Sequence, residues 1–385
     1  MAALGSAPFG VYVHVPFCAT RCGYCDFNTY TATELGSGAS AAQYAETVIG
    51  ELALARRVLG DVDLPARTVF FGGGTPTLLP PEDLVRVLRS IAETFGLAAD
   101  AEVSTEANPE SVSPATLSAL RAGGVNRISF GMQSAVPHVL ATLDRTHTPG
   151  RARQAVDQAR AAGFDRVSLD LIYGTPGESD EDWRTSVRAA LDAGVDHVSA
   201  YSLIVEPGTR LAGRVARGEL PMPDDDVLAD RYAIADEMFA AAGLGWYEVS
   251  NWARAERDQV RHNLLYWTSG DWWGAGPGAH SHVGGVRWWN VKHPRDYAAR
   301  LADGVSPAAA REVLSDADRA LEDVMLRLRL RSGMAVGALA SRCREPLERA
   351  VGDGLLDPTA YADGRAVLTL RGRLLGDAVI RSLVG

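Results

Sequence analysis

Three cysteines near the start of the chain have the spacing of a metal-binding loop. Cys18, Cys22 and Cys25 form a C-x3-C-x2-C pattern that directly follows a short apolar run at residues 10–15. Three thiolates within eight residues can reach one metal centre, and soft sulfur ligands favour an iron–sulfur cluster. The pattern therefore predicts a cluster bound by the loop that follows a first β-strand.

The spacing of these cysteines alone also allows two other roles, a zinc site and a disulfide. A closed zinc site needs a fourth nitrogen or sulfur ligand, and the nearest candidate is His14, four residues before the first cysteine on the predicted strand. A disulfide would leave one of the three cysteines unpaired, and it suits a small secreted domain better than a chain of 385 residues.

Other residues that could bind a ligand or take part in catalysis also follow predicted strands. Consecutive glycines expose backbone N–H and C=O groups and let a ligand lie against the main chain. The carboxyl ends of parallel strands meet at one edge of a sheet, so we expect these residues to converge on one site. They are Gly72, Gly73, Gly74 and Thr75 after the second strand, Glu106 and Asn108 after the third, Gln133 after the fourth, Asp170 in the fifth and Tyr201 at the sixth.

An alternation of strands and helices is predicted to position these groups. Several helices are predicted to begin at signals such as Ser113-Pro114 and to end at glycines such as Gly123. The predicted strands are 11–15, 68–71, 101–105, 127–131, 166–172 and 197–202, and the helices are 41–59, 81–95, 114–121, 151–162, 180–193 and 226–242. Six such units predict an incomplete (β/α)6 TIM-like barrel in the α/β class. A doubly wound open sheet is the alternative.

The sequence pattern changes twice along the chain, which predicts three segments. Residues 1–245 form the partial barrel, and residues 246–310 form an aromatic and glycine-rich connecting segment. Residues 311–385 are predicted to form a mainly helical, winged-helix-like C-terminal domain. Its predicted elements are helices 317–330, 336–343 and 345–352 and a hairpin over 361–370 that turns at Asp363-Gly364.

Composition narrows the possible partners and location. A net charge of −10 argues against broad binding to nucleic acid, so a structural role is preferred over DNA binding for the C-terminal domain. There is no basic segment followed by an apolar core at the start, and no apolar run long enough for a membrane, which predicts a cytoplasmic protein. Four cysteines, three of them clustered, fit a reducing compartment.

The order strand, C-x3-C-x2-C, then Phe71-Gly72-Gly73-Gly74-Thr75-Pro76 on the next strand resembles the radical S-adenosylmethionine (SAM) superfamily. The resemblance implies that Cys18, Cys22 and Cys25 bind three irons of a [4Fe–4S] cluster, and that the fourth iron binds the amino and carboxylate groups of SAM. It also implies that the GGGTP segment contacts the methionine part of SAM, and that the reduced cluster can cleave SAM to a 5′-deoxyadenosyl radical.

Further segments resemble the coproporphyrinogen III oxidase-like branch over nearly the whole chain: EVSTEANPES, RISFGMQS, LDRTHT and LDLIYGTPGE. For Arg145 an ordinary surface ion pair is the alternative role. The residues that this resemblance assigns to SAM are Tyr12, Gly73, Gly74, Thr75 and Glu106, and those assigned to the nucleotide or a second SAM are Tyr24, Gln133, Arg145 and Asp170.

Two features separate the subfamilies of this branch. The oxidases carry an additional cysteine two positions after the third, where this chain has Phe27. The CDFN sequence, the YEVSNWAR segment and the motif His262-Asn263-x-x-Tyr266-Trp267 resemble the HemW-type heme chaperones. The resemblance makes His262 the candidate axial ligand of heme, whereas a lone histidine in an aromatic segment is otherwise most often a structural residue with both nitrogens satisfied.

The resemblance thus implies a heme chaperone that binds a [4Fe–4S] cluster, SAM and heme and delivers heme to acceptor hemoproteins, respiratory ones among them. It further implies an electron donor, a homodimer and, for membrane-bound acceptors, peripheral association with the membrane. The alternatives are an oxygen-independent coproporphyrinogen III oxidase, which decarboxylates propionate side chains by radical chemistry, a related radical SAM methyltransferase or heme-degrading enzyme, and a non-redox zinc protein.

Overall fold

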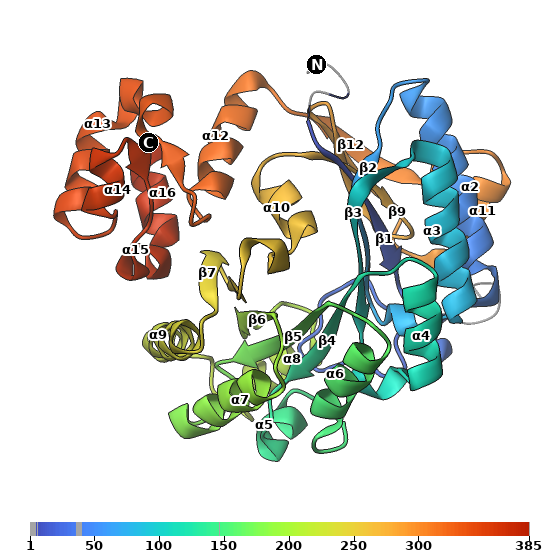
Figure 1. Cartoon of the computed structure of the whole chain (residues 1–385), viewed down its shortest axis with the longest axis horizontal. Helices are drawn as coiled ribbons and strands as arrows, with labels where there is room; N and C mark the ends of the chain where they lie inside the picture. Colours follow the sequence, from blue (N-terminus) through green and yellow to red (C-terminus); the bar gives the residue numbers. More distant parts are fainter. Residues whose placement is uncertain (1–4, 6, 36–40, 146, 385) are drawn as a thin grey trace.

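Residues 5, 7–35, 41–145 and 147–384 are described by the computed structural model of the chain. Thr146, within the LDRTHT motif, lies outside the described residues. Figure 1 shows a curved sheet with helices on its outer side and a separate helical unit near the C-terminus.

Six parallel strands form the centre of the sheet in the order of the sequence. A doubly wound sheet would reverse its strand order at a switch point, so the doubly wound alternative is wrong and the partial barrel is confirmed. The described strands do not close, because β12 and β7 end the sheet on opposite sides. The six strands are β1 (Phe9–Val15), β2 (Ala66–Gly73), β3 (Leu97–Ala107), β4 (Arg127–Gln133), β5 (Arg166–Tyr173) and β6 (His197–Ser202).

The predicted helices cover the outer face of these strands (Figure 1). In α3 the residues Leu84, Val87, Leu88 and Ile91 are buried at helical spacing and join one core cluster with the strands. A capping box at Ser179 begins α7. The helices are α2 (Ala41–Leu59), α3 (Pro81–Phe95), α4 (Pro114–Ala122), α6 (Arg151–Ala161), α7 (Asp180–Asp192) and α9 (Asp225–Ala241), with the shorter, unpredicted α1 (Ala32–Leu35), α5 (Pro137–Thr142) and α8 (Arg210–Ala216).

Strands from the aromatic segment extend the sheet, which the sequence patterns did not predict. β9 (Asp271–Ala275) pairs in parallel with β1, so a segment from late in the chain lies beside the strand that enters the cysteine loop. Trp273 packs into the core and contacts Trp288, with ring centroids 4.9 Å apart. The remaining elements are β10 (His280–Val283), β11 (Val286–Asn290) and β12 (Ala308–Val313) beyond β9, β8 (Asn251–Ala253) and β7 (Gly245–Glu248) beyond β6, and the helices α10 (Arg261–Trp267) and α11 (Pro294–Ala302).

The C-terminal unit is mainly helical, as predicted, and has its own core cluster. The hairpin predicted over 361–370 is wrong. Asp357 accepts a hydrogen bond from the N–H of Ala360, and Pro358 is the first residue of a short helix that Gly364 follows with φ +80°. The elements are α12 (Asp316–Arg327), β13 (Met334–Ala335), α13 (Val336–Gly352), α14 (Pro358–Ala362), β14 (Arg365–Ala366), α15 (Leu370–Leu374) and α16 (Gly376–Val384), with β13 pairing with β14.

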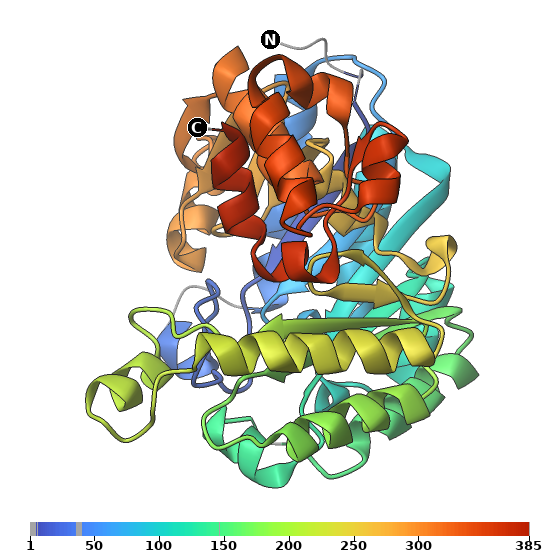
Figure 2. The same ribbon diagram turned by 90° about the vertical axis from the view of Figure 1, so that its left-hand side faces the viewer.

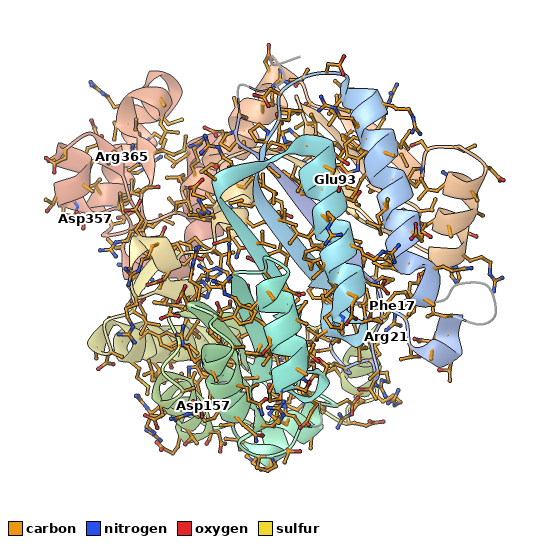
Figure 3. The ribbon with its side chains drawn as sticks, turned by 45° about the vertical axis from the view of Figure 1, so that its right-hand side comes forward. Phe17, Arg21, Glu93, Asp157, Asp357 and Arg365 are labelled. Carbon is orange, nitrogen blue, oxygen red and sulfur yellow. The ribbon has the colours of Figure 1, made fainter. Side chains whose placement is uncertain are left out.

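The two helices predicted at 336–343 and 345–352 are confirmed as two helical parts of α13, which meet at a kink at Cys343. Figure 2 shows the C-terminal unit above α9, and Arg373 connects the two by donating hydrogen bonds to Asp236 at 2.9 and 2.7 Å. Asp357 and Arg365 of this unit lie far from Phe17 and Arg21 of the cysteine loop in Figure 3. None of the described helices has the length and apolar character needed to cross a membrane.

Candidate metal centre and cofactor cavity

A cavity of about 580 Å³ opens at the carboxyl ends of the barrel strands. This is the edge at which the sequence predicts a site, and most of the predicted residues lie there together. Tyr12 and His262 are not among the residues that line it. The predicted residues that do are Cys18, Cys22, Tyr24, Cys25, Gly73, Gly74, Thr75, Glu106, Asn108, Gln133, Arg145, Asp170 and Tyr201.

The cysteine loop is braced from both of its ends. The Nε2 atom of His14 lies 2.9 Å from the carbonyl oxygen of Asn28, and the Tyr12 hydroxyl lies 2.9 Å from His14 Nδ1. The Nε2 atom therefore carries the proton and donates to the carbonyl, while Nδ1 accepts from Tyr12. The Asn28 side chain donates to the carbonyl oxygens of Pro277 and Lys292, at 3.0 and 2.8 Å. His14 and Tyr12 thus support the loop as a chain of hydrogen bonds.

The three thiols of this loop are free and half-buried. Burial raises the pKa of the Cys18 thiol to about 11, with Cys25 adding to the effect, and burial also raises the pKa of Cys25. A closed zinc site would need His14 as its fourth ligand, but both ring nitrogens of His14 already have hydrogen-bond partners. Three thiols without a fourth ligand fit a [4Fe–4S] cluster better than closed zinc.

The glycines of the GGGTP segment pack directly on the backbone of the cysteine loop. The N–H groups of Gly74 and Thr75 donate to the carbonyl oxygens of Val15 and Phe17, each at 2.7 Å. A Cβ atom on Gly74 would lie 2.5 Å from the Phe17 oxygen. Gly73 has φ +108°, a conformation that favours glycine. Glycine is needed here because the two loops touch through their main chains.

Two carboxylates face the cavity from β3 and β5, the strands on either side of β4. Glu106 accepts a hydrogen bond from the Gly73 N–H at 3.0 Å, and burial together with the charge of Asp170 raises the pKa of Glu106 to about 7. Burial also raises the pKa of Asp170, although hydrogen bonds from Ser199 and Ser129 oppose the shift. A bound cationic group would relieve this cost for both carboxylates.

Arg145 supplies the opposite charge within the same cavity. Its Nη2 atom donates to the carbonyl oxygen of Gly131 at 2.8 Å, and Nη1 contacts the Cys22 sulfur at 3.4 Å. The Nε atom is buried and has no hydrogen-bond partner among the described residues, which leaves a donor available for an anionic ligand. The alternative of an ordinary surface ion pair for Arg145 is therefore wrong. Carboxylates and a guanidinium around one cavity fit the ammonium and carboxylate groups of SAM.

Arg127 belongs to the floor of the cavity and was not predicted. Its Nε atom donates to Glu102 at 3.1 Å, and Nη2 donates to the carbonyl oxygens of Asp258 and Gln259 at 2.7 and 3.0 Å. Arg127 and Glu102 are 1% and 0% exposed. Arg127 thus forms an ion pair within the barrel and connects the barrel to the segment that leads into α10.

A period-two pattern of polar residues in the strands could have identified this floor. Alternate side chains of a strand point to the same face, so polar residues at every second position of a buried strand indicate a lined interior. The residues are Arg127 and Ser129 in β4, Ser168 and Asp170 in β5, and His197, Ser199 and Tyr201 in β6.

His262 lies on α10 behind the cavity wall and is 1% exposed. Its Nδ1 atom lies 2.8 Å from the Thr68 hydroxyl oxygen, and Nε2 lies 2.7 Å from the Tyr266 hydroxyl oxygen. The ring stacks on Phe70 with centroids 5.3 Å apart, and burial lowers the pKa of His262 to about 3. The imidazole is neutral, but both of its nitrogens already have partners.

Comparisons with known proteins agree with this fold and cavity. Residues 12–190 match the family model of the radical SAM superfamily. The chain is 56% identical to the heme chaperone HemW of Mycobacterium tuberculosis over 100% of this chain and 97% of that protein. It is 32% identical to the heme chaperone HemW of Bacillus subtilis over 97% of this chain and 98% of the relative.

The fold is similar to the solved structure of coproporphyrinogen III oxidase (HemN) from Escherichia coli, a radical SAM enzyme. The match covers 98% of this chain and 90% of that protein's chain, with a TM-score of 0.83 and 23% sequence identity. At that identity the likeness concerns the fold. The full-length identity to the heme chaperones and the three free cysteines beside a glycine segment lead to one conclusion: the chain belongs to the HemW heme chaperone family of the radical SAM superfamily.

Proposed function

We propose that this chain is a heme chaperone, which binds heme and passes it to acceptor hemoproteins. The observation that carries the proposal is the 56% identity over the whole chain to a protein with this function. Phe27 agrees with it, because a phenylalanine that is 61% exposed lines the cavity where the related oxidases have a further cysteine.

Within this proposal, Cys18, Cys22 and Cys25 hold the [4Fe–4S] cluster of the radical SAM family, and the cavity holds SAM. When bound, the cluster supplies one-electron chemistry. Glu106 and Asp170 face the cationic part of SAM, and Arg145 holds an anionic group through its free Nε atom. Gly73, Gly74 and Thr75 offer main-chain polar groups at close range, while Tyr24 and Gln133 complete the wall.

The HNxxYW motif and the aromatic strands beside it are the proposed heme region. Glu248 accepts hydrogen bonds from the side chains of Asn263 and Trp267, which holds two residues of the motif in place. Tyr266 contacts Trp272 with ring centroids 4.6 Å apart, so the motif packs against strand β9. If His262 itself binds iron, the ring has to leave its two hydrogen-bond partners.

An anaerobic titration tests this function. The cluster is reconstituted, heme is added in steps, and coproporphyrinogen is then offered with SAM and a reductant. We expect stoichiometric heme binding without decarboxylation. Turnover to protoporphyrinogen would favour the oxidase over the carrier, and absence of heme binding would refute the proposal.

Two cysteine variants give the matched comparison. Cys22→Ala removes a predicted cluster ligand, whereas Cys343→Ala removes the cysteine that lies outside the loop, where its thiol donates to the Leu383 carbonyl oxygen at 2.7 Å. We expect iron and sulfide to be lost only from Cys22→Ala. Equal cluster content in the two variants would contradict the ligand assignment.

The partners beyond heme are also part of the proposal. Acceptors at a membrane would require the cytoplasmic chain to associate with the membrane surface, and a reduced cluster requires an electron donor. The net charge of −10 speaks against nucleic acid as a partner. Size-exclusion chromatography with light scattering, with and without heme, tests the predicted homodimer.

A further inference from the structure

The strands that extend the sheet beyond β1 carry an aromatic surface outside the cofactor cavity. Paired residues of antiparallel strands lie on the same face. Trp272 pairs with His282, and His280 pairs with Trp289, so these four residues share one face of β9, β10 and β11. We call them the aromatic face.

His280 is the exposed histidine of this face. Its ring stacks on Trp289, with centroids 5.7 Å apart and an interplanar angle of 22°. No hydrogen bond occupies either ring nitrogen of His280 within the described part of the chain, in contrast to His262. Partial burial and the nearby charges of Lys292 and Arg287 lower the pKa of His280, which favours the neutral imidazole that binds iron.

Positive charge flanks the same histidine. Lys292 is exposed, is the only lysine in the sequence, and has no acidic partner among the described residues. Arg287 is paired with Glu312 and Glu322, so Lys292 is the cation available to a ligand. An anionic group on a flat aromatic ligand would find a partner in Lys292.

The aromatic face also adjoins the cysteine loop. The carbonyl oxygen of Lys292 accepts a hydrogen bond from the Asn28 side chain at 2.8 Å. The charge of His280 influences the pKa of His14, the residue that braces the loop. None of the four residues of the aromatic face lines the cofactor cavity, so a ligand on this face would lie beside the cysteine loop and outside the cavity.

We propose that heme docks on the aromatic face with the His280 imidazole as its axial ligand, Trp289 beside the porphyrin and Lys292 at a propionate. This inference rests on the proposed function and locates its cargo. A cargo that is handed to another protein needs an accessible ligand, and His280 is exposed whereas His262 is 1% exposed. His262 then acts as a positioning residue, because it holds Tyr266, which contacts Trp272.

Hemin titration of the cluster-loaded protein tests the ligand, with difference absorption and electron paramagnetic resonance spectra as readouts. The variants are His280→Ala, His262→Ala and, as a matched control, His138→Ala, an exposed histidine on α5 whose side chain is 57% exposed. We expect His280→Ala to lose the imidazole-ligated spectrum and to bind hemin at least about ten-fold more weakly. His138→Ala should keep both that spectrum and the hemin affinity. His262→Ala should keep the spectrum but bind hemin more weakly, because it no longer holds Tyr266 against Trp272.

Chemical labelling of Lys292 gives an independent readout. An amine-reactive reagent modifies few sites in a chain with one lysine, and the α-amino group serves as an internal reference. We expect hemin to protect Lys292 in the wild type and not in His280→Ala. Unchanged labelling with saturating hemin would overturn the docking surface.

The outcomes separate this inference from the proposed function. Heme binding by the wild type, with the imidazole spectrum retained in His280→Ala, overturns the inference and leaves the carrier function standing. A wild type that binds no hemin overturns both. Loss of the imidazole spectrum in His262→Ala alone, with His280→Ala unchanged, would assign the iron to α10 instead.

Discussion

Replacing Glu106 by glutamine should stabilise the cofactor-free protein and weaken SAM binding. Burial and Asp170 raise the pKa of Glu106 from 4.5 to about 7. At 1.36 kcal/mol per pKa unit, the shift disfavours the ionised folded state by about 3 kcal/mol. Water in the cavity reduces this cost, so we expect a gain of about 1 to 3 kcal/mol for Glu106→Gln at pH 8. Glutamine keeps the acceptor for the Gly73 N–H.

The sign of the pH dependence follows from the raised pKa. Below about pH 4 the carboxyl is protonated in both the folded and the unfolded chain, so the variant gains nothing there. Between pH 5 and 8 the unfolded chain loses the proton first, and the wild type loses stability relative to the variant, with the full difference reached above the folded pKa of about 7.

Urea unfolding of both proteins between pH 5 and 8 measures the stability difference. Equilibrium dialysis with labelled SAM, after cluster reconstitution, measures binding, which we expect to fall at least about ten-fold because glutamine cannot neutralise an ammonium group. A stability difference that does not grow with pH would refute the burial argument. Unchanged SAM affinity would refute the role of Glu106 as a cofactor contact.

Three further substitutions test other parts of the structure. Gly74→Ala brings a Cβ within 2.5 Å of the Phe17 carbonyl oxygen, so we expect loss of SAM binding with the cluster retained, measured by dialysis and iron content. Arg127→Met leaves Glu102 buried without its closest cation and should cost about 3 to 5 kcal/mol in urea unfolding, more than the double variant with Glu102→Gln. Arg373→Met breaks the contacts with α9, and we expect faster proteolysis between the barrel and the C-terminal unit, with wild-type rates counting against that role.

The barrel could be predicted from the sequence because its signals are local. Apolar runs, helix starts such as Ser113-Pro114 and the capping box at Ser179 act within a few residues, and each structural element follows from its own segment. The extension of the sheet could not be predicted in the same way. β9 pairs with β1 across more than half of the chain, and Trp272 and Trp273 look alike in sequence although only Trp273 enters the core. The wrong hairpin had a local signal that was missed, Asp357 before Pro358.

In the site, too, local signals predict some residues, while the surroundings of others depend on contacts far apart in the sequence. The cysteines and glycines follow strand ends, so their convergence follows from parallel topology. The surroundings of His262 could not be predicted in this way, because one of its hydrogen-bond partners is Thr68, 194 positions earlier. No local pattern distinguishes a histidine with both nitrogens bonded from one that is free, and for that reason the sequence ranks His280 as a weaker candidate than His262.

The place of β1 between β2 and β9 has a consequence for biosynthesis. The ribosome delivers β2 soon after the cysteines, but β9 emerges only when residues 271–275 have been made. Until then one edge of β1 has no neighbour, and Asn28 lacks its contact with Pro277. A nascent chain that ends at residue 245 would therefore present the cysteines on an incompletely braced loop, open to the factors that insert clusters, and the last third of the chain would close it.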